Sequence, residues 1–117
     1  MRHRVRGNNL GRMGSERKAL LKGMAIDLII HGKIRTTDAK AKALRPYVER
    51  LVTIARKDTL SNRRLIASRL NNPNGVKVLF KTIAPRYAER KGGYLRLIKI
   101  SGFQRGDATR LSELQWV

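Results

Sequence analysis

The sequence predicts an α+β fold of two layers, in which helices pack on one face of a small mixed β-sheet of about three strands. Apolar residues recur every three or four positions through most of residues 16–83, which is typical of amphipathic helices. The period changes to two in 94–100 and 110–117, which is typical of strands. A chain of 117 residues with 41% hydrophobic content suits one globular domain. We place that domain at 15–117, after an extended basic N-terminal arm at 1–14.

The first predicted helix covers residues 16–31. Ser15 is the expected N-cap, and Gly32 supplies the left-handed residue that ends the helix. Residues 33–37 are few and partly β-branched, so they predict a brief strand.

A second helix is predicted over residues 38–57, with Thr37 as its N-cap. Pro46 lacks the N–H that a helix interior needs and is expected to bend the helix, although the apolar register continues through it. After a turn at 58–61, a helix over 62–70 is followed by another, with Asn72 as its N-cap and Pro73 at its first position, that ends at Pro85.

The strands at 94–100 and 110–117 are expected to form a hairpin across the loop 101–109. The strand at 33–37 is the expected third member of the sheet. Gly92 and Gly93 form a basic turn before the hairpin; because they precede a strand and not a helix, they do not match a phosphate-binding loop.

Positive charge dominates the composition. The chain has 27 Lys and Arg against 8 Asp and Glu, a formal net charge of +19. A compact molecule with this charge repels itself unless an anion neutralises it, and nucleic acid, an acidic membrane surface and an acidic protein all qualify. The basic residues are spread along the whole chain, which favours nucleic acid. Aromatic residues are only 5% of the chain, which favours recognition of RNA backbone and shape over base stacking.

The arm reads MRHRVRGNNLGRMG and has no acidic residue before Glu16. Its glycines and asparagines disfavour a helix, so we expect it to become ordered on an anionic partner. It lacks the apolar stretch of a secretory signal, and no segment is apolar enough to span a bilayer.

The sequence offers no catalytic or metal site. It has no cysteine and only two histidines, His3 and His31, which lie far apart. No two carboxylates have the spacing that would place them on one helix face. Ser15 and Thr37 begin helices beside basic residues and are candidate anion sites, with simple capping as the alternative. A DNA-binding protein and a small RNA-processing enzyme remain alternatives, although no helix-turn-helix pattern is present.

Short motifs along the whole chain resemble the bacterial large-subunit ribosomal protein L-seventeen family. They are MRHR at 1–4, KIRTT at 33–37, AKAK at 39–42, SNRR at 61–64, LF at 79–80, APRY at 84–87, RKGGY at 90–94 and GFQRGD at 102–107. The resemblance implies an α/β ribosomal protein without enzymatic activity, cofactor, small-molecule substrate or membrane contact, located on cytoplasmic ribosomes. Its implied partners are large-subunit rRNA, near the exit-tunnel side, and neighbouring large-subunit ribosomal proteins.

The residues expected to bind RNA follow from the charge pattern and from this resemblance. In the arm they are Arg2, His3, Arg4, Arg6 and Arg12. In the predicted domain they are Arg17, Lys18, Lys33, Arg35, Thr36, Thr37, Lys40, Lys42, Arg63, Arg64, Arg90, Lys91 and Tyr94.

Overall fold

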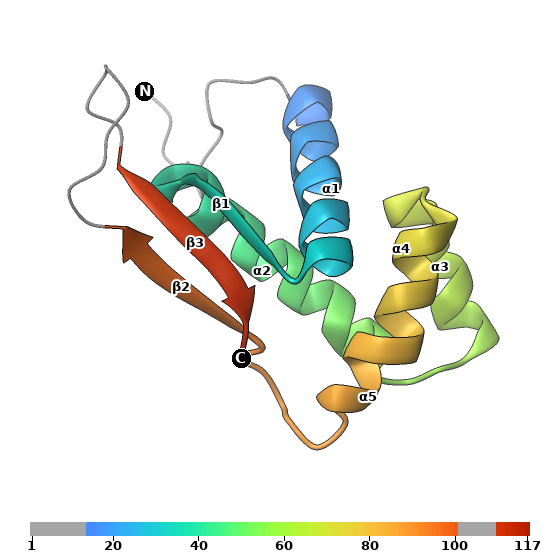
Figure 1. Ribbon diagram of the computed structural model, residues 1–117. Coiled ribbons are helices and arrows are strands. Elements are labelled where there is room, and N and C mark those ends of the chain that lie inside the picture. The colour runs from blue at the N-terminus through green and yellow to red at the C-terminus, as the bar shows by residue number, and fades with distance from the viewer. Residues whose placement is uncertain (1–13, 101–109) are drawn as a thin grey trace, which may run out of the picture.

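The structure, a computed structural model, describes residues 14–100 and 110–117. Its elements in chain order are α1 (Gly14–His31), β1 (Lys33–Thr37), α2 (Asp38–Ala55), α3 (Leu60–Leu70), α4 (Pro73–Val78), the π-helix η1 (Leu79–Ile83), α5 (Ala84–Arg86), β2 (Leu95–Ile100) and β3 (Leu111–Trp116) (Figure 1). The predicted arm up to residue 13 and the predicted hairpin loop lie outside the described residues.

The predicted α+β class and all three predicted strands are confirmed. The strands form one sheet in the order β1-β3-β2, so the hairpin partner β3 lies in the centre and β1 joins its free edge. Leu114 of β3 faces Ile34 of β1 and Leu97 of β2 in register. The expectation of a mixed sheet was wrong, because both pairings among the described strands are antiparallel.

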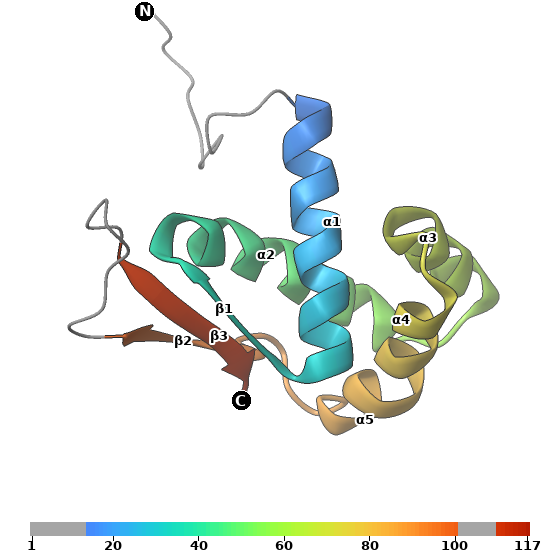
Figure 2. The ribbon, with the colours of Figure 1, turned by 45° about the horizontal axis from the view of Figure 1, so that its top comes forward.

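The layering differs in part from the prediction that helices pack on one face of the sheet. α1 and α2 lie against the sheet, but α3, α4 and α5 lie beyond them, on the side away from the strands (Figures 1 and 2). Neighbouring strands are about 4.8 Å apart and a helix is about 10 Å wide, so a three-stranded sheet has room for only one or two helices. The remaining helices therefore pack on α1 and α2.

A continuous apolar core joins the sheet to α1 and α2 and to the helices that lie beyond them. α2 supplies one fully buried stripe along its length, with Leu44, Val48 and Val52 each at 0% exposure. The same cluster contains Leu28 of α1, Ile66 of α3 and Leu114 of β3. The complete core therefore contains residues from both ends of the described chain.

Polar contacts attach the C-terminal strand to α1 and to the helices. The indole Nε1 of Trp116 donates to the carbonyl of Leu28 at 3.2 Å, and the Tyr87 hydroxyl donates to the carbonyl of Val117 at 2.7 Å. The rings of Tyr87 and Trp116 are 6.0 Å apart, in the range in which aromatic pairs stabilise each other.

The helix boundaries follow the capping residues with small shifts. α1 begins at Gly14, so Ser15 lies inside the helix. The expectation that Ser15 is the N-cap was therefore wrong. Gly32 has φ of +89° directly after α1, as predicted for the residue that ends the helix. α2 begins after its N-cap Thr37 as predicted, runs through Pro46 as one helix, and ends at Ala55.

The later helices depart further from the prediction. α3 begins at Leu60 because Thr59 caps it, accepting from the amide of Asn62 at 3.1 Å. Asn72 caps α4 with Pro73 in its first turn, as predicted. The helix was expected to end at Pro85 but continues to Arg86, because the wider turn of η1 precedes it. That wider turn gives the proline ring room that a regular α-turn would deny.

Tyr94 connects the C-terminal end of α2 to the chain that enters the sheet. Its side chain is completely buried, and its hydroxyl accepts from Nη1 of Arg56 at 3.2 Å and donates to the carbonyl of Arg90 at 3.2 Å. Nη2 of Arg56 also donates to the carbonyl of Ala88 at 3.0 Å. One arginine and one tyrosine thus hold the turn before β2 against α2.

We expect Tyr94→Phe to lower the free energy of unfolding by about 1–2 kcal/mol, because Nη1 of the half-buried Arg56 loses its acceptor and the Arg90 carbonyl loses its donor. Urea denaturation followed by circular dichroism measures this change. The ring and its packing are retained in this variant, so an unchanged urea midpoint would show that the hydroxyl contacts are not stabilising.

Candidate nucleic-acid interface

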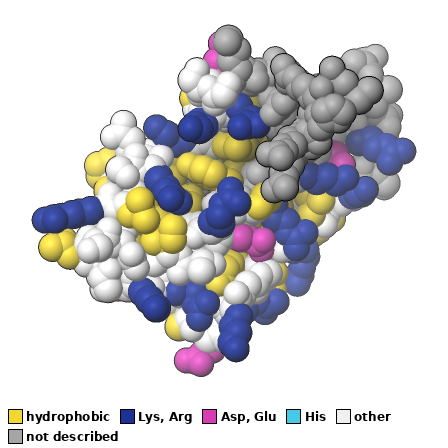
Figure 3. Space-filling view, turned by 180° about the vertical axis from the view of Figure 1, so that it is seen from behind, with side chains coloured by type: hydrophobic (Ala, Val, Ile, Leu, Met, Phe, Trp, Pro, Cys, Tyr) yellow, Lys and Arg dark blue, Asp and Glu magenta, His cyan; other side chains and the backbone are white. Residues whose placement is uncertain are grey.

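Six cations line a pocket between α1, α2 and α3, which we call the basic pocket. Its volume is about 750 Å³, and six of its ten lining residues are Lys or Arg while none is acidic. The lining residues are Arg17, Lys18, Leu21 and Lys22 of α1, Lys42, Ala43, Pro46, Tyr47 and Arg50 of α2, and Arg69 of α3. Figure 3 shows a face on which Lys and Arg side chains surround apolar ones, with few acidic side chains among them.

Helical spacing explains how two of the three helices supply these residues. Lys42, Pro46 and Arg50 are four positions apart and therefore lie on one face of α2. Lys18 and Lys22 are likewise four apart on α1. The packing of α1, α2 and α3 around a common core then brings the three faces to one hollow.

Tyr47 is the aromatic residue of the basic pocket, and its side chain is half-buried. Burial raises the pKa of its phenol above the usual value, and the nearby charges of Arg69 and Arg50 oppose that rise. The phenol therefore stays protonated at neutral pH and can donate a hydrogen bond to an oxygen or nitrogen acceptor.

The start of α2 combines capping with an internal carboxylate. Oγ1 of Thr37 accepts from the amide of Lys40 at 3.4 Å, so Thr37 is a cap as the alternative interpretation held. Asp38 accepts from the Ser112 hydroxyl at 2.7 Å and forms an ion pair with Lys42 at 3.1 Å. Both contacts, the serine bond first, lower the pKa of Asp38. This carboxylate adds a negative charge at the helix N-terminus, which makes the position less favourable for a phosphate.

Three cations lie on the face of the sheet opposite the buried Ser112 and Leu114. Two of them, Lys33 and Arg35, were expected to bind RNA, and the third is Arg96. Lys33 and Arg96 flank Gln115 of β3 in register, and Arg35 lies opposite Glu113. These basic side chains are exposed, and Nζ of Lys33 is 3.9 Å from the Glu113 carboxylate. Thr36 is half-buried and pairs with Ser112, which places it on the helix side of the sheet.

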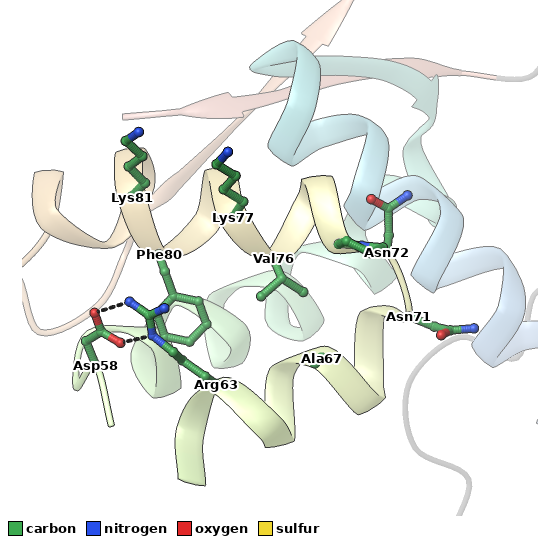
Figure 4. Close-up of a pocket in the computed structure, with 10 residues that line it drawn as sticks. Asp58, Arg63, Ala67, Asn71, Asn72, Val76, Lys77, Phe80 and Lys81 are labelled. Atoms are coloured by element: carbon green, nitrogen blue, oxygen red, sulfur yellow. Dashed lines mark hydrogen bonds and ion pairs between the residues drawn. The ribbon is translucent and has the colours of Figure 1, made fainter. Parts of the chain in front are cut away.

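Arg63, predicted to bind RNA, is engaged within the protein. Its guanidinium pairs with both carboxylate oxygens of Asp58 and lies 5.3 Å from the ring centre of Phe80 (Figure 4). This contact lowers the pKa of Asp58. The neighbouring Arg64 is exposed on α3.

The last three residues expected to bind RNA lie in the turn before β2 and differ in exposure. Arg90 and Lys91 are exposed, although Nε of Arg90 donates to the carbonyl of Gly92 at 3.2 Å. Tyr94 is 0% exposed, which does not agree with its expected role in RNA binding. Its ring fills the space between α2 and the sheet, so it is not offered to a base. Arg2, His3, Arg4, Arg6 and Arg12 lie outside the described residues.

Residues 20–117 match the family model described as ribosomal protein L17. The chain belongs to the ribosomal protein L17 family. This is a family of structural proteins of the large ribosomal subunit and not a class of enzymes.

Relatives named large ribosomal subunit protein bL17 match the chain over its whole length. The Persephonella marina protein is 49% identical, with all of this chain and 95% of the relative covered. The Orientia tsutsugamushi protein is 47% identical, with all of this chain and 80% of the relative covered. The Hydrogenobaculum protein is 42% identical, with all of this chain and 99% of the relative covered.

Sequence reasoning missed three cations of the basic pocket in this L17-family chain. Lys22, Arg50 and Arg69 were not among the residues expected to bind RNA, yet they line the pocket beside Arg17, Lys18 and Lys42, which were. The separation of eight residues between Lys42 and Arg50, about two helical turns, could have indicated that the two share a face. No local signal identifies Arg69, because α3 reaches the pocket only through tertiary packing.

The described part of the chain holds no group of three or more His, Cys, Asp or Glu side chains that could bind a metal ion. Within the same residues, no helix is both long and apolar enough to cross a membrane.

We expect Asp38→Asn to lower the free energy of unfolding by about 1 kcal/mol at pH 7, because the amide loses the charge-assisted contacts with Ser112 and Lys42. The pKa of Asp38 is lower in the folded chain than the unfolded value of about 3.9. Its contribution is therefore present above that value and is lost as the pH falls through the folded pKa. Urea unfolding of both proteins from pH 7 to pH 3 tests this; a difference that does not shrink with acidification would contradict it.

Proposed function

We propose that this chain is a structural component of the large ribosomal subunit that binds rRNA through its basic arm and the basic faces of its helices and sheet. The observation that carries the proposal is the basic pocket, where six cations from three helices line one hollow without an acidic residue. The names of the relatives support the choice of the large subunit. Neighbouring large-subunit proteins are the expected further partners.

Such a site recognises RNA mainly through phosphates. A guanidinium can bond two phosphate oxygens with its planar fork, so arginines such as Arg50 and Arg69 can bridge adjacent or separate strands. These two residues come from α2 and α3, which the core holds in fixed relation. The protein would thus fix the distance between RNA segments, which is a structural role that needs no reacting group, cofactor or small-molecule substrate.

The proposed RNA-binding residues differ in whether they already contact other side chains of the protein. The exposed Lys18, Arg35, Arg64 and Lys91 would contact phosphates directly, and Lys33 would share its charge with Glu113. Arg63 would first exchange its contact with Asp58 for one with RNA. Lys42 would share its charge with Asp38. Tyr94 is left out because it is buried.

We expect the double variant Arg50→Gln with Arg69→Gln to bind large-subunit rRNA more weakly. Each lost phosphate contact should also reduce the slope of log affinity against log salt by about 0.7–0.9. Filter binding of the full chain to transcribed rRNA at several salt concentrations measures both effects.

Arg45→Gln is the matched control for this experiment. Arg45 lies on the same helix, is exposed, and has its Nε 3.9 Å from Glu49 outside the basic pocket. The control removes one charge and the double variant two, so an equal loss of log affinity per charge removed would mean that net charge matters and the pocket does not.

Deletion of residues 1–13 should weaken rRNA binding and flatten its salt dependence, because it removes four arginines. The circular dichroism spectrum of the remaining chain should keep its helical signal, since the core lies within the described residues. Loss of that signal would show that the arm is part of the folded domain.

A further inference from the structure

We propose that the basic pocket holds a single unpaired nucleotide of RNA, with the phosphate among its cations and the base against Tyr47. This inference rests on the proposed function, RNA binding, and specifies the chemistry that the pocket recognises. It also amends the sequence-based expectation that backbone and shape alone are recognised.

Two kinds of surface meet in the basic pocket. Leu21, Ala43, Pro46 and Tyr47 are apolar or aromatic, and the six cations surround them. A site for phosphate alone gains nothing from exposed apolar surface, whereas a flat base covers such surface and removes it from water. The volume of about 750 Å³ lies within the size range of small-molecule sites.

Tyr47 differs in its surroundings from the other described aromatic residues. Tyr87 and Tyr94 have ring centres 5.3 Å apart and are buried against the sheet with Trp116. Phe80 is 8% exposed and lies beneath the Arg63 guanidinium. Phe80 and Tyr94 also line hollows that contain cations, but both are buried, whereas Tyr47 is half-buried in the lining of the basic pocket. Bases stack on such rings, and nearby arginines add to the interaction.

The shape of the site selects an unpaired nucleotide over a paired one. In an RNA duplex the faces of the bases are covered by their neighbours, so a ring in a recess cannot reach them. A bulged or looped base can leave the stack and enter a recess while its phosphate stays at the rim. The protonated phenol of Tyr47 and the guanidinium groups of Arg50 and Arg69 are donors that suit the acceptors of a base and of a phosphate.

The test compares three RNA hairpins of the same stem. One has a single bulged adenosine, the second has an abasic residue at the bulge, and the third has no bulge. Fluorescence anisotropy of labelled hairpins with the full chain at about 0.15 M salt gives the three affinities. We expect the adenosine bulge to bind at least about fivefold more tightly than the abasic one, as a stacked base would provide.

Variants of Tyr47 assign the preference to the pocket. Tyr47→Leu keeps apolar bulk against the core but removes the ring, and should abolish the adenosine preference while leaving affinity for the abasic hairpin within about twofold. Tyr47→Phe keeps the ring and should keep the preference. Arg45→Gln should leave both affinities nearly unchanged, because Arg45 does not line the pocket.

The outcomes separate this inference from the proposed function. Equal binding of the adenosine and abasic hairpins would overturn the nucleotide site while leaving RNA binding intact. An adenosine preference that survives in Tyr47→Leu would place the base elsewhere and would also overturn it. Failure of every hairpin and of rRNA to bind would overturn the proposed function itself. Should Tyr47→Leu lose its helical circular dichroism signal, the comparison of hairpins with Tyr47→Phe and the unaltered chain still decides the result.

Discussion

The structure depends on the burial of one stripe of α2 between two groups of elements. The stripe comprises Ala41, Leu44, Val48, Leu51, Val52 and Ala55. On one side it meets the sheet, and on the other it meets α1, α3 and η1. Since burial of a single Leu or Val side chain is worth about 1.5–3 kcal/mol, this stripe is a large share of the favourable free energy available to a small domain. It also fixes the orientation of every helix that carries a cation of the basic pocket.

In this arrangement the apolar residues form the core, and the charged residues lie on the surface. Helices that bury one stripe expose the rest of their circumference, and in this sequence the charged residues at exposed helical positions are mostly Lys and Arg. Ion pairs such as those of Lys42 with Asp38 and Arg45 with Glu49 offset only part of the repulsion. With a formal charge of +19, the folded chain gains stability from a polyanion that neutralises it. In the proposed function, stability and RNA binding would therefore be coupled through the same surface cations.

Local sequence identified many of the exposed cations of the candidate interface, but it did not identify which side chains are buried or engaged within the protein. Lys18 and Arg35 were recognisable as exposed because each falls outside an apolar period. Tyr94 was misjudged because the resemblance places it beside basic residues in the RKGGY motif, whereas its ring is part of the core and its hydroxyl holds Arg56. Arg63 was correctly placed on the surface, yet the sequence did not reveal that Asp58 and Phe80 engage it.

The sequence by itself determined the class of fold, the three strands, the caps at Thr37, Asn72 and Gly32, and the need for an anionic partner, because each depends on periodicity, on one residue's conformational preference or on net charge. Tertiary structure alone decided that the sheet is antiparallel throughout, that α3, α4 and α5 pack away from it, and that Arg69 joins Lys22 and Arg50 around Tyr47. These outcomes depend on contacts between residues distant in the chain, for which the local pattern of apolar and charged residues carries no information.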